Sequence, residues 1–266
     1  MQYESTRRSA LVSLGLATIG AAAAATATST AAAEVKQRSA KGLVPAGAAA
    51  LADLTARLAR VPRRRDFRTV PMVLDDPMLW DHEALDEVFA YAGGPRQVWD
   101  STDLAGPWLN LMRNSLNAQV WSYKYPDFLA VSATHGTAQF ALFDQTIWDK
   151  YQLAKLTGGK FTSNSLINRN AAADADRDHQ SPSGAFSGEN NTIPALMDRG
   201  VVFLACHLMI WELTDKLLKQ GVNPDGLSHE AMAAEITNHL IPGVILTPGM
   251  VATIPGLQQR GFHYIA

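Results

Sequence analysis

Val201-Val-Phe-Leu-Ala-Cys206 is the stretch of sequence that decides the fold. Apolar residues follow one another up to the cysteine without a polar interruption, which is typical of a strand covered on both faces, as in a parallel sheet. A helical pattern at 207–220 follows directly, with apolar side chains on one stripe. A strand that leads straight into a helix predicts an α/β protein.

The same alternation extends outward from this stretch in both directions. Short apolar runs predict further strands at 97–99, 128–133, 242–247 and 261–265. Helical patterns lie between these runs, and Ser228 is the expected N-cap of one of the helices. We therefore expect residues 95–266 to form an α/β domain with a parallel sheet and helices on both of its faces.

Two segments depart from this alternation. Residues 157–191 are rich in Gly, Ser, Asn, Asp and Ala, and loops longer than about 15 residues in a compact domain are usually functional or disordered. We expect a polar insertion here, which is a lid over the site, a wrap around a neighbouring subunit, or a solvated surface loop. Residues 34–94 predict an N-terminal helical extension, in which the arginine-rich run at 60–65 is interpreted as a solvated linker.

The N-terminus has the three parts of an export signal. Arg7 and Arg8 precede an uncharged stretch at 9–33, which ends in three alanines. We expect a twin-arginine signal peptide at 1–33 and a periplasmic protein that is exported already folded. The alternative is an N-terminal membrane anchor, although the stretch is rich in Ala and Thr and would be a poor span.

The remaining composition limits the partners. Cleavage after Ala33 removes Glu4, Arg7 and Arg8, so Lys+Arg falls from 23 to 21, Asp+Glu falls from 25 to 24, and the net charge moves from −2 to −3. Such a balance gives no reason to expect nucleic acid as a partner. No later stretch approaches about 18 continuous apolar residues, so no membrane contact is expected once the signal is removed.

Cys206 is the lone cysteine of the chain, so no intramolecular disulfide is expected. It ends the 201–206 strand and begins a helix, and ligands of parallel α/β sheets sit beyond the carboxyl ends of the strands. The partial positive charge of a helix N-terminus favours a thiolate, so Cys206 is the candidate catalytic residue. The alternative is that Cys206 is a small buried apolar residue.

A second candidate site residue ends another strand. His135 follows the 128–133 run and is followed by Gly136 and Thr137. We expect these three residues, together with His207 beside the cysteine, to bind a small ligand. The alternative for His135 is a turn residue or a contact between subunits.

Several classes of site lack their motifs in this sequence. The seven histidines show no HxH, HxxxH or HExxH spacing, and no metal site is predicted. Dinucleotide-binding, P-loop and nucleophile-elbow glycine patterns are also missing. The sequence therefore names no cofactor and no reaction.

Three C-terminal stretches carry a resemblance to a known family. They are Gly-Val-Val-Phe-Leu-Ala-Cys at 200–206, Leu-Ile-Pro-Gly-Val-Ile-Leu-Thr-Pro-Gly at 240–249 and Leu-Gln-Gln-Arg-Gly-Phe-His-Tyr-Ile at 257–265. In combination they resemble the DsrE/DsrF-like family of sulfur-relay and related proteins. The stretch at 109–116, which contains Asn114, resembles the first helix of that family, and 127–136 resembles its second strand.

The resemblance implies a three-layer α/β/α domain with a five-stranded, mainly parallel sheet, assembled as a trimer or hexamer. It also implies that Cys206 carries a persulfide and that Asn114 belongs to the ligand site. The leading hypothesis is an exported DsrE-like protein that binds or relays a small sulfur species through Cys206. The alternatives are a non-catalytic module for ligand binding or assembly on the same fold, and a small-molecule enzyme that uses His135 and the insertion.

Overall fold

The computed structural model describes residues 42–266. The signal peptide predicted at 1–33 and the first part of the extension predicted at 34–94 lie outside the described residues. Residues Leu43–Ala266 cluster into one compact unit. In this unit no helix is long and apolar enough to cross a membrane.

A five-stranded parallel sheet forms the centre of this unit, in the order β4-β3-β2-β1-β5. The strands are β1 (Arg96–Ser101), β2 (Leu129–Thr134), β3 (Val202–Cys206), β4 (Ile245–Thr247) and β5 (His263–Ile265). Every residue of β2 and of β3 is buried, as their mainly apolar runs predict for central strands. The β4 strand is shorter than the predicted 242–247 because Gly243 adopts φ +94° in the turn before it.

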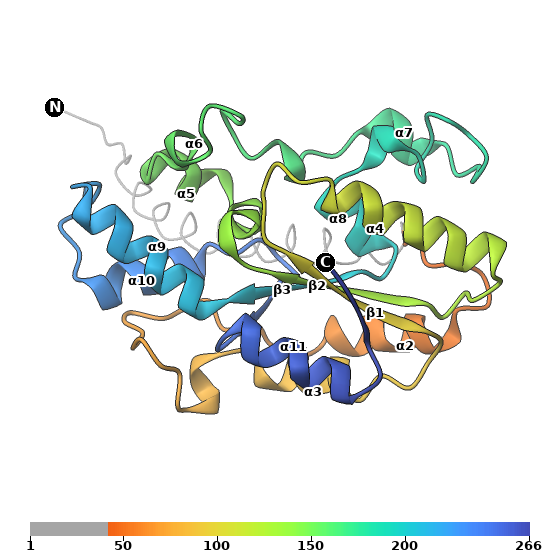
Figure 1. Cartoon of the computed structure of the whole chain (residues 1–266), viewed down its shortest axis with the longest axis horizontal. Coiled ribbons are helices and arrows are strands. Elements are labelled where there is room, and N and C mark those ends of the chain that lie inside the picture. Colours follow the sequence, from red (N-terminus) through yellow and green to blue (C-terminus); the bar gives the residue numbers. More distant parts are fainter. Residues whose placement is uncertain (1–41) are drawn as a thin grey trace, which may run out of the picture. The chain divides into compact units, whose positions relative to one another are not determined.

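Helices cover both faces of the sheet, which confirms the predicted three-layer α/β/α architecture (Figure 1). One face, the upper face in Figure 1, carries α4 (Trp108–Asn117), α5 (Gln145–Lys150), α6 (Leu153–Leu156) and α8 (Ile193–Asp198). The helices α9 (His207–Lys219) and α10 (His229–Asn238), at the left of Figure 1, belong to the same apolar layer. The lower face carries α2 (Ala49–Leu58), α3 (His82–Phe89) and α11 (Met250–Gln259). The extension predicted at 34–94 thus supplies two of the three lower helices.

The direction of the chain explains this division. From β1 to β4, each new strand is added beside the previous one in the same direction across the sheet. Right-handed crossovers therefore place the helices that connect these strands on the upper face. The connection from β4 returns to the far side of β1, so α11 lies on the lower face. The chain therefore leaves the neighbouring strands β3 and β4 toward opposite faces, and ligands bind at such a switch point in open α/β sheets.

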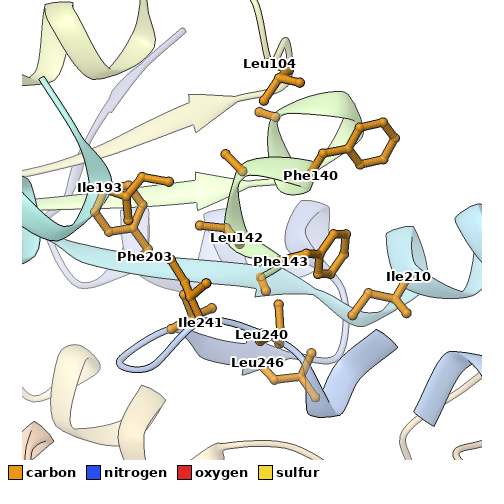
Figure 2. Packing of buried hydrophobic residues seen from close by; sticks show 14 of the residues in the cluster. Leu104, Phe140, Leu142, Phe143, Ile193, Phe203, Ile210, Leu240, Ile241 and Leu246 are labelled. Atoms are coloured by element: carbon orange, nitrogen blue, oxygen red, sulfur yellow. The ribbon is translucent and has the colours of Figure 1, made fainter. Parts of the chain in front are cut away.

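The upper core is a continuous apolar layer between the sheet and its helices (Figure 2). Phe203 of β3 packs against the Trp108 ring in an edge-on contact with 6.2 Å between the ring centroids. The short helix η3 (Gly136–Leu142) adds Phe140 and Leu142 to this layer. Ser228 caps α10 as predicted, since its side chain accepts a hydrogen bond from the Ala231 backbone N–H at 3.2 Å.

The insertion at 157–191 packs onto the upper layer and contains three short elements. They are η4 (Ser165–Ile167), α7 (Ala171–Ala175) and η5 (Gly188–Asn190). The buried Asn164 side chain donates hydrogen bonds to the backbone carbonyls of Ala141 and Phe143, at 3.0 and 2.7 Å. Phe161 and Ile167 pack against the upper core. The insertion is thus held by specific contacts with the body of the domain.

The interpretation of residues 60–65 as a solvated linker is wrong for its C-terminal half. Arg65 forms an ion pair of 3.0 Å with Asp81, whose side chain is 0% exposed. The Asp81 carboxylate also accepts hydrogen bonds from the backbone N–H groups of Arg64 and of Leu246 in β4. A buried carboxylate needs such partners, so the arginines tie the extension to the sheet. Residues 60–65 alone do not reveal this role because Asp81 lies beyond them.

Candidate functional site

Polar side chains from several strands meet at the carboxyl edge of the sheet, on its lower face. Alternation along the strands places Asp100 of β1 and His135 after β2 on the same face as Cys206. Thr134 of β2 pairs with Ala205 of β3. His135 follows Thr134, and Cys206 follows Ala205, so the two candidates lie at the same level of the sheet. The structure therefore brings both principal candidates to one edge, as expected from the sequence.

His135 is held by a carboxylate that is itself held by a phenol. The Nε2 atom of His135 lies 2.7 Å from Asp100 Oδ1. The Tyr264 hydroxyl of β5 donates to Asp100 Oδ2 at 2.6 Å. This hydrogen bond raises the pKa of Tyr264 above its ordinary value, because it favours the protonated phenol. We call these three residues the Asp–His–Tyr cluster.

The Asp–His–Tyr cluster is partly open to solvent. The His135 and Asp100 side chains are 21% and 20% exposed, and Tyr264 is 43% exposed. In the described part of the chain, His135 Nδ1 has no hydrogen-bond partner and is not buried. A small molecule can therefore reach the cluster from outside the core.

Gly136 and Thr137 fix the backbone that presents His135. Gly136 has φ +56°, and a Cβ atom there would lie 2.6 Å from the Thr102 carbonyl oxygen, so the turn requires glycine. The Thr137 hydroxyl accepts a hydrogen bond from the Leu104 backbone N–H at 3.1 Å. Both residues thus join the loop after β1 to the loop after β2, and they position His135.

Cys206 lies at the switch point between β3 and β4. Its sulfur accepts a hydrogen bond from the backbone N–H of Met250, the first residue of α11, at 3.3 Å. It also begins α9 as the N-cap residue. Two helix N-termini therefore converge near one sulfur.

The expectation that this position favours a thiolate is not met. Cys206 is 6% exposed, and burial raises the pKa of its thiol above the ordinary value, although the nearby backbone N–H groups act in the opposite direction. Desolvation of a charged sulfur outweighs the helix N-termini here because α11 covers the thiol. Cys206 is therefore a protonated, buried thiol at neutral pH.

Gln139 is a site residue that the sequence interpretation missed. Its buried side chain accepts from the Cys206 backbone N–H at 2.8 Å and donates to the Cys206 carbonyl oxygen at 3.0 Å. This double hydrogen bond fixes the end of β3 against η3. A glutamine within an apolar run, as in Thr-Ala-Gln-Phe-Ala-Leu at 137–142, is the sequence signal for such a buried contact.

Asp100 and Tyr264 were missed as well. Asp100 interrupts the apolar end of β1 and is followed by the buried Ser101, so a charged residue near a strand end was an available signal. Tyr264 had no such signal, because its role depends on β5 pairing in parallel with β1.

The structure places His207 and Asn114 elsewhere. The His207 ring is buried, and its Nε2 atom lies 2.8 Å from the Pro71 carbonyl oxygen. Burial lowers the pKa of His207 below its ordinary value. Asn114 lies on α4, where its side chain accepts a hydrogen bond from Arg113 at 2.9 Å. Neither side chain contacts the Asp–His–Tyr cluster.

Residues 42–266 contain no group of three or more His, Cys, Asp and Glu side chains that could hold a metal ion. Comparisons with protein-family models, with curated proteins and with solved structures find no match to this chain.

Proposed function

We propose that the chain binds a small molecule at the carboxyl edge of its sheet, and that His135 is the proton acceptor of this site. The observation that carries the proposal is the 2.7 Å contact between His135 Nε2 and Asp100, with Tyr264 on the other carboxylate oxygen. The cluster lies at the carboxyl edge of the sheet, where ligands of α/β sheets bind, although the switch point itself lies between β3 and β4, at Cys206.

The hydrogen bonds define which nitrogen of His135 accepts a proton. A carboxylate accepts hydrogen bonds and does not donate them, so the Nε2 atom that faces Asp100 carries the proton. Nδ1 then presents a lone pair to a bound molecule and accepts a proton or a hydrogen bond from it. Asp100 stabilises the positive charge that this transfer produces on the ring. Tyr264 fixes the orientation of Asp100.

Replacement of His135 tests this proposal against a matched control. The chain has a second Asp–His pair, in which His239 Nδ1 lies 2.8 Å from Asp144, in the loop before β4. We expect His135→Asn to weaken binding of a small molecule by roughly tenfold to a hundredfold, the cost of a hydrogen bond to a charged group. His239→Asn leaves the affinity unchanged.

Ligand-detected NMR of a mixture of small carboxylates, carbonyl compounds and thiosulfate provides the measurement. A bound compound that loses affinity in His135→Asn and keeps it in His239→Asn supports the proposal. Equal affinity for the wild type and both variants would contradict it, since binding would then not involve His135.

Sulfur relay through Cys206 is the second candidate function. It is favoured by one observation, the Met250 N–H that points at the Cys206 sulfur and would stabilise an anionic sulfur there. It requires opening of α11, because the thiol is covered. The periplasmic location and the trimer or hexamer stay predictions of the sequence and belong to this second candidate.

Alkylation of Cys206 separates the two candidates. We expect iodoacetamide to label native Cys206 at least about a hundredfold more slowly than the unfolded chain, because reaction needs local opening. Mass spectrometry of the alkylated cysteine peptide over time measures both rates. Rapid labelling of the native protein at neutral pH would overturn our preference for the Asp–His–Tyr cluster and favour relay.

The raised pKa also predicts a dependence on pH. Because the folded state favours the protonated thiol, the stability contributed by Cys206 is present below pH 9.0, the ordinary pKa of a thiol, and is lost as the pH rises above that value. We expect the difference in unfolding free energy between the wild type and Cys206→Ser to shrink above pH 9.0. Denaturant titrations at several pH values check the direction.

A further inference from the structure

Two arginines share the region where the insertion meets α4, toward the amino edge of the sheet. Arg199 follows α8 and precedes β3, and Arg113 projects from α4. The Arg199 side chain is buried, at 4% exposure. Within residues 42–266 neither arginine forms an ion pair with a carboxylate. Arg113 Nη1 and the Asn117 amide both donate to the Phe186 carbonyl oxygen, and Asn117 is the partner of Arg199. Two like charges thus lie close together without an acid between them.

Each of these arginines has a buried N–H group with no partner. Arg199 Nη1 and Arg113 Nε are inaccessible to solvent and make no hydrogen bond within the described residues. A buried cation without a counter-charge is costly. Burial, with the Arg113 charge as a second cause, lowers the pKa of Arg199 to about 9, so the side chain is still charged at neutral pH.

The neighbouring groups hold one edge of the Arg199 guanidinium and leave Nη1 without a hydrogen-bond partner. Arg199 Nη2 donates to Asn117 Oδ1 at 2.8 Å, and Asn117 donates to the Phe186 carbonyl oxygen at 3.0 Å. The guanidinium carbon lies 5.1 Å from the Phe186 ring centroid and 5.4 Å from that of Trp121. These contacts orient the guanidinium without neutralising it.

A third arginine in the same region shows the contrast. Arg169 of the insertion forms ion pairs with Asp174 and Asp198, at 3.3 and 2.7 Å. Arg169 thus has two carboxylate partners, whereas Arg113 and Arg199 have none within the described residues. The counter-charge that Arg113 and Arg199 lack is that of an anion.

We propose that Arg113 and Arg199 bind a small oxyanion, a phosphate or a carboxylate, at the contact between α4 and the insertion. Guanidinium groups match such anions with paired N–H donors, and the unpartnered Nη1 and Nε atoms provide them. Arg113 is partly accessible and Asn114 beside it is exposed, so an anion can reach Arg113 from solvent. This site is separate from the Asp–His–Tyr cluster.

Binding of inorganic phosphate and of formate to the full chain tests the proposal. Equilibrium dialysis with radiolabelled phosphate and radiolabelled formate at constant ionic strength gives the affinities. We expect saturable binding of at least one anion by the wild type and roughly tenfold or greater loss in Arg113→Gln and in Arg199→Gln. Arg169→Gln is the matched control and keeps the affinity.

Arg113→Gln keeps the test valid if Arg199→Gln fails to fold, because Arg113 is partly exposed. Tighter binding of phosphate or of formate shows whether the site prefers a phosphate or a carboxylate. The proposal is overturned if neither anion binds the wild type, or if Arg113→Gln binds as well as the wild type. Arg199 would then serve only to pack against the rings of Phe186 and Trp121.

Discussion

Asp81→Asn is expected to lower the free energy of unfolding by roughly 3–5 kcal/mol, the cost of breaking a buried ion pair. Asp81 is fully buried, and its carboxylate holds Arg65, the Arg64 backbone N–H and the Leu246 backbone N–H. The amide keeps the shape of the side chain and removes its charge, so Arg65 loses its counter-charge. The lower end of the range is favoured, since Arg65 is 17% exposed.

Urea denaturation of the wild type and the variant measures this loss. Glu83→Gln is the matched control, because Glu83 pairs with Arg64 in the same basic run but is 39% exposed. That pair lowers the pKa of Glu83 to about 2, yet an exposed ion pair contributes less than about 1 kcal/mol. If Asp81→Asn costs no more than Glu83→Gln, the role assigned to the basic run is wrong.

Gln139→Met is expected to cost about 2–4 kcal/mol and to expose Cys206 to reagents. Methionine has a similar volume, so the main loss is two hydrogen bonds to the Cys206 backbone. The Cys206 N–H is left without a partner, which costs about 1–3 kcal/mol, and the loss of the hydrogen bond to the Cys206 carbonyl, which also accepts from α9, adds about 1 kcal/mol. With the end of β3 released from η3, we expect faster alkylation of Cys206 by iodoacetamide.

Urea denaturation and the alkylation rate are measured on the same preparation. Gln258→Met on the exposed face of α11 is the control, and it is expected to change neither quantity. An unchanged alkylation rate in Gln139→Met would show that α11 alone protects the thiol.

The fold was largely predictable because its signals are local. The apolar runs of β2 and β3 identify central strands, and the strand–helix alternation identifies the parallel sheet. The ends of β4 were not predictable in the same way, because the Gly243 turn competes with the strand. The structural role of Asp81 was not predictable either, because its partners lie both before it and far after it in the sequence, as far as Leu246 in β4.

The site was predictable in its place and only partly in its chemistry. His135 follows β2 and Cys206 ends β3, so their common position at the carboxyl edge follows from the topology. The state of the thiol depends on α11, which comes 44 residues later and buries it. Likewise, the partner of Asp100 is Tyr264, 164 residues away. Such pairings arise from tertiary packing, and no local pattern encodes them.

The most direct test of the proposed ligand site observes the His135 ring itself. The measurement is a two-dimensional ¹H–¹⁵N spectrum of the histidine rings, recorded while the best-binding compound of the NMR mixture is added. We predict that His135 has its proton on Nε2, and that its ring signals shift saturably while those of His239 stay unchanged. Signals of His135 that remain constant while the compound binds would contradict a ligand site at the Asp–His–Tyr cluster.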